Sequence, residues 1–167
     1  MRHEPVIDWL LEENQPAVRY FTLVDLVERG KDDPEVRQTY SNISRKGWAF
    51  DILSMQKRNG HWQSARSLYL PKYTSTNWMS LILSDLGLGR EERGVRKAAD
   101  LIFNQWLAVP SMRNIFNDEV CVVGNTARML TRFGYVDDFR VRKLFDRLVE
   151  DQKEDGGCTA LNRRVVA

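Results

Sequence analysis

The amino-acid sequence predicts an all-helical domain built from repeated helical hairpins. Apolar residues recur at helical spacing, a short acidic corner sequence occurs three times, and no segment of useful length alternates with a period of two. We therefore expect that helices hold over half of the residues, that there is essentially no β-sheet, and that residues 1–167 form one domain.

Composition limits the function classes. The chain has 167 residues, of which 43% are hydrophobic and 29% charged, so it can bury one sizeable core. The net charge is +2 with basic and acidic residues intermixed, which argues against nucleic-acid partners. No apolar run approaches the ~20 residues of a membrane span, and the N-terminal segment is too acidic for a targeting peptide, so we expect no membrane span and a cytoplasmic location. Cys121 and Cys158 are far apart in the sequence and are expected to be free thiols.

The repeated corner has a simple physical reading. Residues 32–37, 91–96 and 137–142 each contain an acidic pair followed by Val-Arg, and each lies a few residues after a glycine. An acidic pair favours the N-terminus of a helix, and the valine would begin that helix's buried face. We expect the glycines to end the preceding helices in the left-handed conformation; they are Gly30, Gly89 and Gly134.

Helical periodicity fills in the remaining elements. Apolar residues at i, i+3, i+4 and i+7 predict helices near residues 6–11, 18–26, 48–55, 78–86, 95–106, 120–133 and 141–149. Residues 60–73 and 108–117, rich in Ser, Pro, Asn and Arg, are predicted to be loops.

A second repeated marker lies where helical patterns stop. Gln56 is followed by Gly60-His61-Trp62, and Gln152 is followed by Gly156-Gly157-Cys158, while Gln105-Trp106 is a shorter version. A glutamine near a helix end can bond to loose backbone groups while the glycine turns the chain. Each unit is therefore predicted to run helix, corner, helix, turn.

This marker carries a family resemblance. Lys46-Gly47-Trp48-Ala49-Phe50, then Gln56, then Gly60-His61-Trp62, resembles the QW motif of squalene and oxidosqualene cyclases. Gln152 with Gly156 is similar to a second, partial copy in which Cys158 replaces the closing aromatic residue. The resemblance implies the α/α-toroid fold of terpenoid cyclases and protein prenyltransferases, present here as an incomplete toroid that is a portion of a larger one. The alternative fold is a HEAT- or armadillo-like superhelix.

The same resemblance implies a site. In the toroid family, the helices after the QW turns begin at the rim of an apolar central cavity, and in this sequence they would begin near residues 73–78 and 118–121. The candidate ligand-binding residues at that rim are Tyr73, Thr76, Asn77, Trp78, Cys121 and Asn125. Trp48 and Trp62 are expected to pack in the core instead.

The catalytic motifs of the family are missing or incomplete. There is neither a DxDD acid nor a DDxxD magnesium site, so cyclisation by this chain is not expected. Glu119 and Cys121 resemble in spacing the first two zinc ligands of protein prenyltransferases, but His61 is a poor third ligand because it lies within the QW-like turn. We therefore expect no metal and no cofactor, with Glu119, Cys121 and His61 as weak candidates.

Two functions from different classes remain open. The first is binding of an apolar, isoprenoid-like small molecule in a central cavity, and an enzyme of this type would be a cyclase- or prenyltransferase-like lyase or transferase. The second is a non-enzymatic protein-interaction scaffold. In either case the last helices near Phe139, Leu144 and Leu148 are expected to lack a neighbour, which predicts a homodimer or a missing remainder of the toroid.

Overall fold

The computed structural model describes residues 5–108 and 119–158, and it is all-helical in these ranges. The helices are α1 (Pro5–Leu10), α2 (Pro16–Phe21), the π-helical η1 (Thr22–Leu26), α3 (Pro34–Asn42), α4 (Gly47–Ser54), α5 (Thr76–Asp85), α6 (Arg93–Gln105), α8 (Val120–Arg132) and α9 (Phe139–Glu150). Helices hold 57% of the described residues, and the β-structure found among them is an isolated bridge between Gln152 and Cys158. This confirms the prediction of an all-helical chain.

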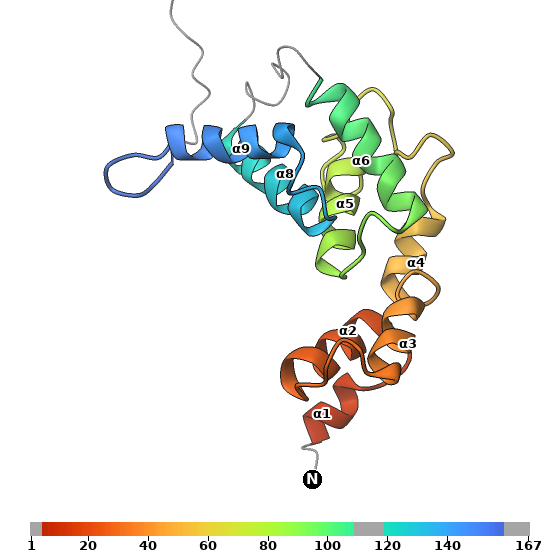
Figure 1. The fold of residues 1–167 in the computed structure, drawn as a ribbon. Helices are drawn as coiled ribbons and strands as arrows, with labels where there is room; N and C mark the ends of the chain where they lie inside the picture. The colour runs from red at the N-terminus through yellow and green to blue at the C-terminus, as the bar shows by residue number, and fades with distance from the viewer. Residues whose placement is uncertain (1–4, 109–118, 159–167) are drawn as a thin grey trace, which may run out of the picture.

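The helices follow an arc, with α1 to α3 at one end and α9 at the other (Figure 1). Neighbouring helices pack as hairpins, α2 with α3 and α8 with α9, while α5 packs against both α6 and α8. One continuous apolar cluster runs through most of the array and includes the fully buried Ile43, Leu83, Ile102 and Leu130. None of the helices described is long and apolar enough to cross a membrane.

The three corners begin their helices in the same way. Asp33, Glu92 and Asp138 are the N-cap residues of α3, α6 and α9, and the carboxylate of each accepts a hydrogen bond from a backbone N–H of the first turn. Three residues after each cap comes a valine that is at most 1% exposed, namely Val36, Val95 or Val141. The acidic pair and the buried valine therefore play the roles predicted for them.

Two of the three predicted glycine caps are wrong. Gly134 has a φ of 92° after α8, as expected, but the left-handed residue after α5 is Gly87 (φ 84°) and the one after η1 is Glu28 (φ 57°). The helices preceding the first two corners thus end two residues earlier than the repeat predicts, and Gly30 and Gly89 lie between these helix ends and the corners. After α5 the reason is visible, because the N–H of Leu88 reaches the carbonyl of Leu83 and closes the helix around Gly87.

The two QW-like turns share one conformation. Nε2 of Gln56 donates to the Gly60 carbonyl oxygen at 2.9 Å, and Nε2 of Gln152 donates to the Gly156 carbonyl oxygen at 3.2 Å. In both turns the lysine after the glutamine donates its N–H across the turn, to the His61 and Gly157 carbonyl oxygens respectively. Both closing glycines, Gly60 and Gly156, have a positive φ. The prediction that Gln56 lies against the Trp62 turn is confirmed.

The tryptophans on either side of Gln56 differ in environment. Trp62 is 2% exposed, and its Nε1 donates to the Ile52 carbonyl oxygen at 2.8 Å. Trp48 is 56% exposed, so its predicted packing role is wrong. The reason is that Trp48 lies in the first turn of α4, whose buried residues are Ala49 and Ile52 on another face.

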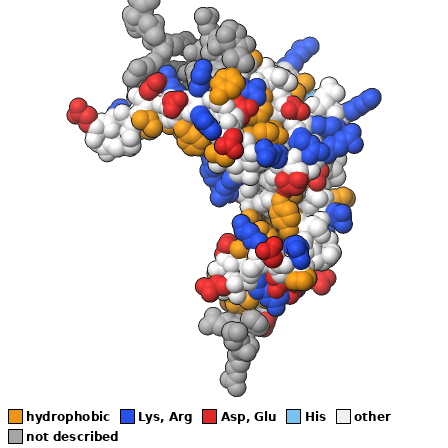
Figure 2. Space-filling model, in the orientation of Figure 1, with side chains coloured by type: hydrophobic (Ala, Val, Ile, Leu, Met, Phe, Trp, Pro, Cys, Tyr) orange, Lys and Arg blue, Asp and Glu red, His pale blue; other side chains and the backbone are white. Residues whose placement is uncertain are grey.

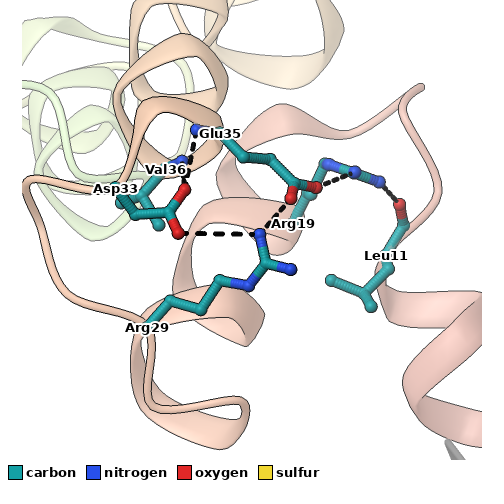
Figure 3. A network of polar contacts seen from close by, with 6 residues as sticks. All are labelled: Leu11, Arg19, Arg29, Asp33, Glu35 and Val36. Carbon is teal, nitrogen blue, oxygen red and sulfur yellow. Dashed lines mark hydrogen bonds and ion pairs between the residues drawn. The ribbon is translucent and has the colours of Figure 1, made fainter.

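A polar network fixes the N-terminal helices (Figure 3). Arg19 of α2 donates to the Leu11 carbonyl oxygen and to Glu35 of α3, and Arg29 also donates to Glu35. Oδ1 of Asp33 accepts from the N–H of Glu35 at 2.8 Å. This network joins the α1–α2 connection, α2 and the start of α3 at the end of the array remote from α9.

Candidate functional site

The candidate site is formed by the exposed stripes of α5 and α8. The two helices run in the same direction, and α6, which lies between them in the sequence, runs back the other way (Figure 1). Both Arg128 and Arg132 donate a hydrogen bond to Oδ1 of Asp85, near the C-terminal ends of the two helices. Arg128 and Arg132 are four residues apart and hence on one face of α8.

The residues accessible on this side follow helical spacing. On α5, Trp78 is half-buried and Ile82 and Asp85 are exposed; on α8, Asn125 is half-buried and Cys121, Arg128 and Arg132 are exposed. Because Asp85 joins the two stripes, we call them together the α5–α8 face, defined by Trp78, Ile82, Asp85, Cys121, Asn125, Arg128 and Arg132.

An aromatic cluster lies at the N-terminal end of this face. The Trp78 ring contacts the rings of both Tyr69 and Tyr73, with centroid separations of 5.3 and 5.0 Å. Nε1 of Trp78 donates to the Tyr69 carbonyl oxygen at 3.0 Å, which fixes the indole orientation. Tyr73 is 70% exposed, so one side of this cluster is open to solvent.

The opposite end of the face is basic. One carboxylate, Asp85, faces two guanidinium groups, and all three side chains are about half exposed, between 46% and 48%. Each guanidinium has five N–H donors, and one from each arginine reaches Asp85. The α5–α8 face therefore offers aromatic and aliphatic surface at one end and N–H donors with a net positive charge at the other.

Thr76 and Asn77, predicted at a cavity rim, lie in the interior. Both are at most 1% exposed. Oγ1 of Thr76 accepts from the N–H of Trp62 at 3.2 Å, which ties the QW-like turn to the start of α5. The N–H of Asn77 donates to the Leu68 carbonyl oxygen at 2.8 Å, and its Oδ1 has no hydrogen-bond partner. Of the predicted rim residues, the structure thus brings Tyr73, Trp78, Cys121 and Asn125 to the accessible side of α5 and α8.

The weak zinc candidates do not come together. Sγ of Cys121 lies 3.6 Å from Oε2 of Glu119, but His61 lies in the turn after α4. Within the described ranges, no three His, Cys, Asp or Glu side chains are grouped so as to hold a metal ion. Cys121 and Cys158 are both free and exposed, as predicted for the thiols.

A cleft with mixed lining adjoins the QW-like turn. It has a volume of about 290 Å³ and is open to solvent. Its lining residues are Met55, Lys57, Trp62, Gln63, Thr74 and Met79. This cleft shares no residue with the α5–α8 face.

Sequence reasoning missed the polar half of the α5–α8 face. Asp85, Arg128 and Arg132 belong to different helices, and only packing places the carboxylate between the two arginines. The sequence does show that the two arginines are four residues apart within a predicted helix. This spacing places them on one face of the helix, but it does not identify the carboxylate that they contact.

Comparisons with protein-family models, curated proteins and solved structures find no match to this chain.

Proposed function

We propose that this protein is a helical scaffold that binds a segment of another protein across the α5–α8 face. The observation that carries the proposal is the pairing of an accessible aromatic cluster, Tyr73 and Trp78, with two half-exposed arginines on one continuous, open surface. Surfaces of this composition, aromatic and arginine-rich, are typical of protein interfaces.

The chemistry of the face favours one kind of partner. Trp78 and Ile82 offer apolar contact, whereas Arg128 and Arg132 present N–H donors that suit carboxylates. A peptide segment with a large apolar residue followed by acidic residues complements both ends. Asp85 holds the two guanidinium groups in place, which lowers the entropy lost when a carboxylate binds.

The arrangement of units supports a repeat scaffold of the toroid type. The three similar N-caps and the two similar Gln-Lys-x-x-Gly turns are what a repeated hairpin unit requires, and the turn resembles the QW motif in its glutamine and in the buried Trp62. We infer an open array of toroid-like hairpins, with a HEAT-like superhelix as the alternative arrangement. An open array exposes its inner helices, as a scaffold requires.

A binding experiment with matched peptides tests the scaffold function. Fluorescence anisotropy would compare labelled peptides that contain one Phe or Leu followed by three Glu with versions carrying Lys in place of Glu. We expect the acidic peptides to bind more tightly, and Arg128→Glu with Arg132→Glu to weaken binding by at least about tenfold. Trp78→Ala should also weaken it, whereas Trp48→Ala, which alters an exposed tryptophan elsewhere, should not. Equal affinity for acidic and basic peptides would contradict the proposal.

A second candidate function is binding of an apolar, isoprenoid-like molecule. The cleft beside the QW-like turn favours it, because Met55, Trp62 and Met79 contribute apolar surface to the lining. Native mass spectrometry of protein purified from its own cells would then show a co-purified lipid, and Met79→Trp, which fills the cleft, would remove the adduct. Protein of unmodified mass from those cells would count against this candidate.

A further inference from the structure

The helices α6 and α9 occupy equivalent positions in successive hairpins. Each begins after an acidic N-cap, Glu92 or Asp138, and the third residue after the cap, Val95 or Val141, is completely buried. In this register Ala98 corresponds to Leu144, and both are also completely buried. Leu144 was expected to be exposed, and that expectation is wrong because α8 and α9 pack closely on this face.

On the neighbouring face, α6 and α9 differ in how far their corresponding side chains are buried. Ala99 and Phe103 of α6 are 0% and 5% exposed, whereas the corresponding Phe145 and Val149 of α9 are 42% and 72% exposed. Phe103 is covered by the following hairpin, since the guanidinium of Arg140 lies 4.0 Å from its ring centroid and the Tyr135 ring 5.3 Å away. The face of α9 that carries Phe145 and Val149 is therefore a helix-packing face without a described neighbour.

The opposite end of the array does not provide the missing neighbour. The residue of α3 that corresponds to Arg140 is Glu35, two residues after the N-cap. Glu35 already accepts hydrogen bonds from Arg19 and Arg29 (Figure 3). A head-to-tail stack of copies would thus place the Glu35 carboxylate and its two arginines against Val149, and taking such an ion-pair cluster out of water is costly.

The exposed side of α9 is instead complementary to itself. Figure 2 shows hydrophobic side chains among acidic and basic ones at the surface over α8 and α9. Exposed residues in the N-terminal half of α9 include Phe139 and Arg142, and those in the C-terminal half include Asp146 and Val149, with Phe145 between them. Arg142 has a long ion pair of 3.4 Å with Asp137, whose side chain is 93% exposed, so it is available for another carboxylate.

We propose that this side of α9 binds α9 of a second copy, antiparallel and about a two-fold axis near residue 144. Such an axis places Arg142 opposite Asp146 of the second copy, and the symmetry repeats this pair. Phe139 then faces Val149 of the second copy, and the two Phe145 rings lie close to the axis. The contact is isologous and closes after two copies.

Charge exchange provides the sharpest test. Arg142→Asp alone would set two carboxylates against each other across the axis, and Asp146→Arg alone would set two guanidinium groups against each other. Each single variant should therefore have a dimer dissociation constant raised by about tenfold or more. An equimolar mixture of the two variants should form a heterodimer, because both of its pairs across the axis then join opposite charges.

In a heterodimer, the Arg142→Asp copy keeps Asp146 and the Asp146→Arg copy keeps Arg142. The new aspartate then faces the new arginine, and native Asp146 faces native Arg142, so both pairs are opposite in charge. The double variant should likewise recover the wild-type constant. Arg45→Asp, a change of the same kind at an exposed position between α3 and α4, is the control.

Analytical ultracentrifugation of the full chain from about 1 to 100 µM measures these constants, with circular dichroism to verify that each variant is folded. We expect a wild-type dimer that Phe145→Glu dissociates, and restored dimerisation in the mixture. A wild-type chain that stays monomeric overturns the proposal, whether its α9 face is covered by its own residues or by another protein. A dimer whose two single charge variants are not restored by mixing overturns the antiparallel arrangement and hence the proposal.

Discussion

Gln56 and Gly94 join the end of α4 to the start of α6. Nε2 of Gln56, at the end of α4, donates to the Gly94 carbonyl oxygen in the first turn of α6 at 2.9 Å. The same nitrogen donates to the Gly60 carbonyl oxygen at 2.9 Å, so both amide protons are used. One side chain therefore fixes the turn after α4 and binds it to α6, which accounts for the presence of a glutamine at this position.

Gln56→Ala should lower the free energy of unfolding by about 1–3 kcal/mol, because it removes two hydrogen bonds in a half-buried environment. Gln152→Ala is the matched control, since Gln152 occupies the same position in the second turn and has a longer, exposed bond of 3.2 Å. We expect the control to change stability by no more than about 0.5 kcal/mol. Urea denaturation followed by circular dichroism measures both. Equal losses in the two variants would show that the contact with Gly94 has no stabilising role.

Gly94→Ala should also destabilise the chain, although alanine normally favours helices. A Cβ at Gly94 would lie 2.6 Å from Cδ2 of Leu53 and 2.9 Å from Oε1 of Gln56, so both side chains would have to move. We expect a loss of about 1–3 kcal/mol from this overpacking.

Gly124→Ala is the control for that substitution. Gly124 lies within α8, and a Cβ there would meet Cδ2 of Leu148 at 3.8 Å, an ordinary contact. The higher helix propensity of alanine should then stabilise the chain by up to about 1 kcal/mol. Urea denaturation of both variants measures the difference. A stabilising effect of Gly94→Ala as well would contradict the close approach of Leu53 and Gln56 to Gly94.

Local signals in the sequence accounted for the helices and for their N-terminal ends. The N-caps at Asp33, Glu92 and Asp138 followed from the acidic pairs, because a cap acts through the backbone of its own first turn. The Gln56 turn was predictable for the same reason. The misplaced caps at Gly30 and Gly89 show the limit, since Gly87 and Glu28 each close the preceding helix earlier than the repeat predicted.

Packing between distant segments determined the rest. Trp48 and Trp62 belong to one motif, yet one is exposed and the other buried, and the sequence pattern of α4 does not separate them. The contact of Asp85 with Arg128 and Arg132 depends on α5 lying beside α8, which no local pattern encodes. Predicted loop residues 109–117 lie outside the described residues.

Trp62→Ala should be among the most destabilising single substitutions. The indole is 2% exposed and its Nε1 donates to the Ile52 carbonyl oxygen at 2.8 Å, so the variant leaves a cavity and removes a buried hydrogen bond. We expect a loss of about 3–5 kcal/mol. Trp48→Ala, at a site that is 56% exposed, should cost less than about 1 kcal/mol. Thermal unfolding of both variants distinguishes them, and similar melting temperatures would refute the packing role of Trp62.

Stability should fall in alkaline solution because of Tyr40. Its hydroxyl donates to Glu91, and burial together with that carboxylate raises the pKa of Tyr40 above its ordinary value. Above a pH of about 10 the unfolded chain therefore loses the Tyr40 proton while the folded chain keeps it, and folding becomes less favourable as pH rises.

Tyr40→Phe should flatten this alkaline dependence and lower stability at neutral pH. Tyr73→Phe, which removes an exposed hydroxyl, is the control and should keep the wild-type dependence. Urea denaturation between about pH 8 and pH 11 measures the slopes. A Tyr40→Phe variant as sensitive to alkali as the wild type would contradict the role of the Tyr40–Glu91 contact.

Acid should weaken the chain partly through Asp138. Its carboxylate accepts from Nε of Arg140 at 2.9 Å, from Nη2 at 2.7 Å and from the Arg140 N–H at 2.9 Å. The side-chain hydrogen bonds from Arg140 hold the pKa of Asp138 below its ordinary value. This contribution to stability is complete above the unfolded-state pKa of about 4 and is lost as pH falls through the lower pKa of the folded state.

Asp138→Asn separates the charge from the cap. Asparagine still caps a helix, so this variant should lose less stability at neutral pH than Asp138→Ala, for which we expect about 1 kcal/mol from the lost cap in addition to the lost ion pair. Between about pH 5 and pH 2 its stability should fall less steeply than that of the wild type, because the titrating carboxylate is gone. Asp137→Asn, whose native side chain is 93% exposed, should retain the wild-type slope. Urea midpoints across this range measure the effect. If Asp138→Asn lost stability in acid as steeply as the wild type, the ion pair with Arg140 would not be the source of the acid sensitivity assigned to Asp138.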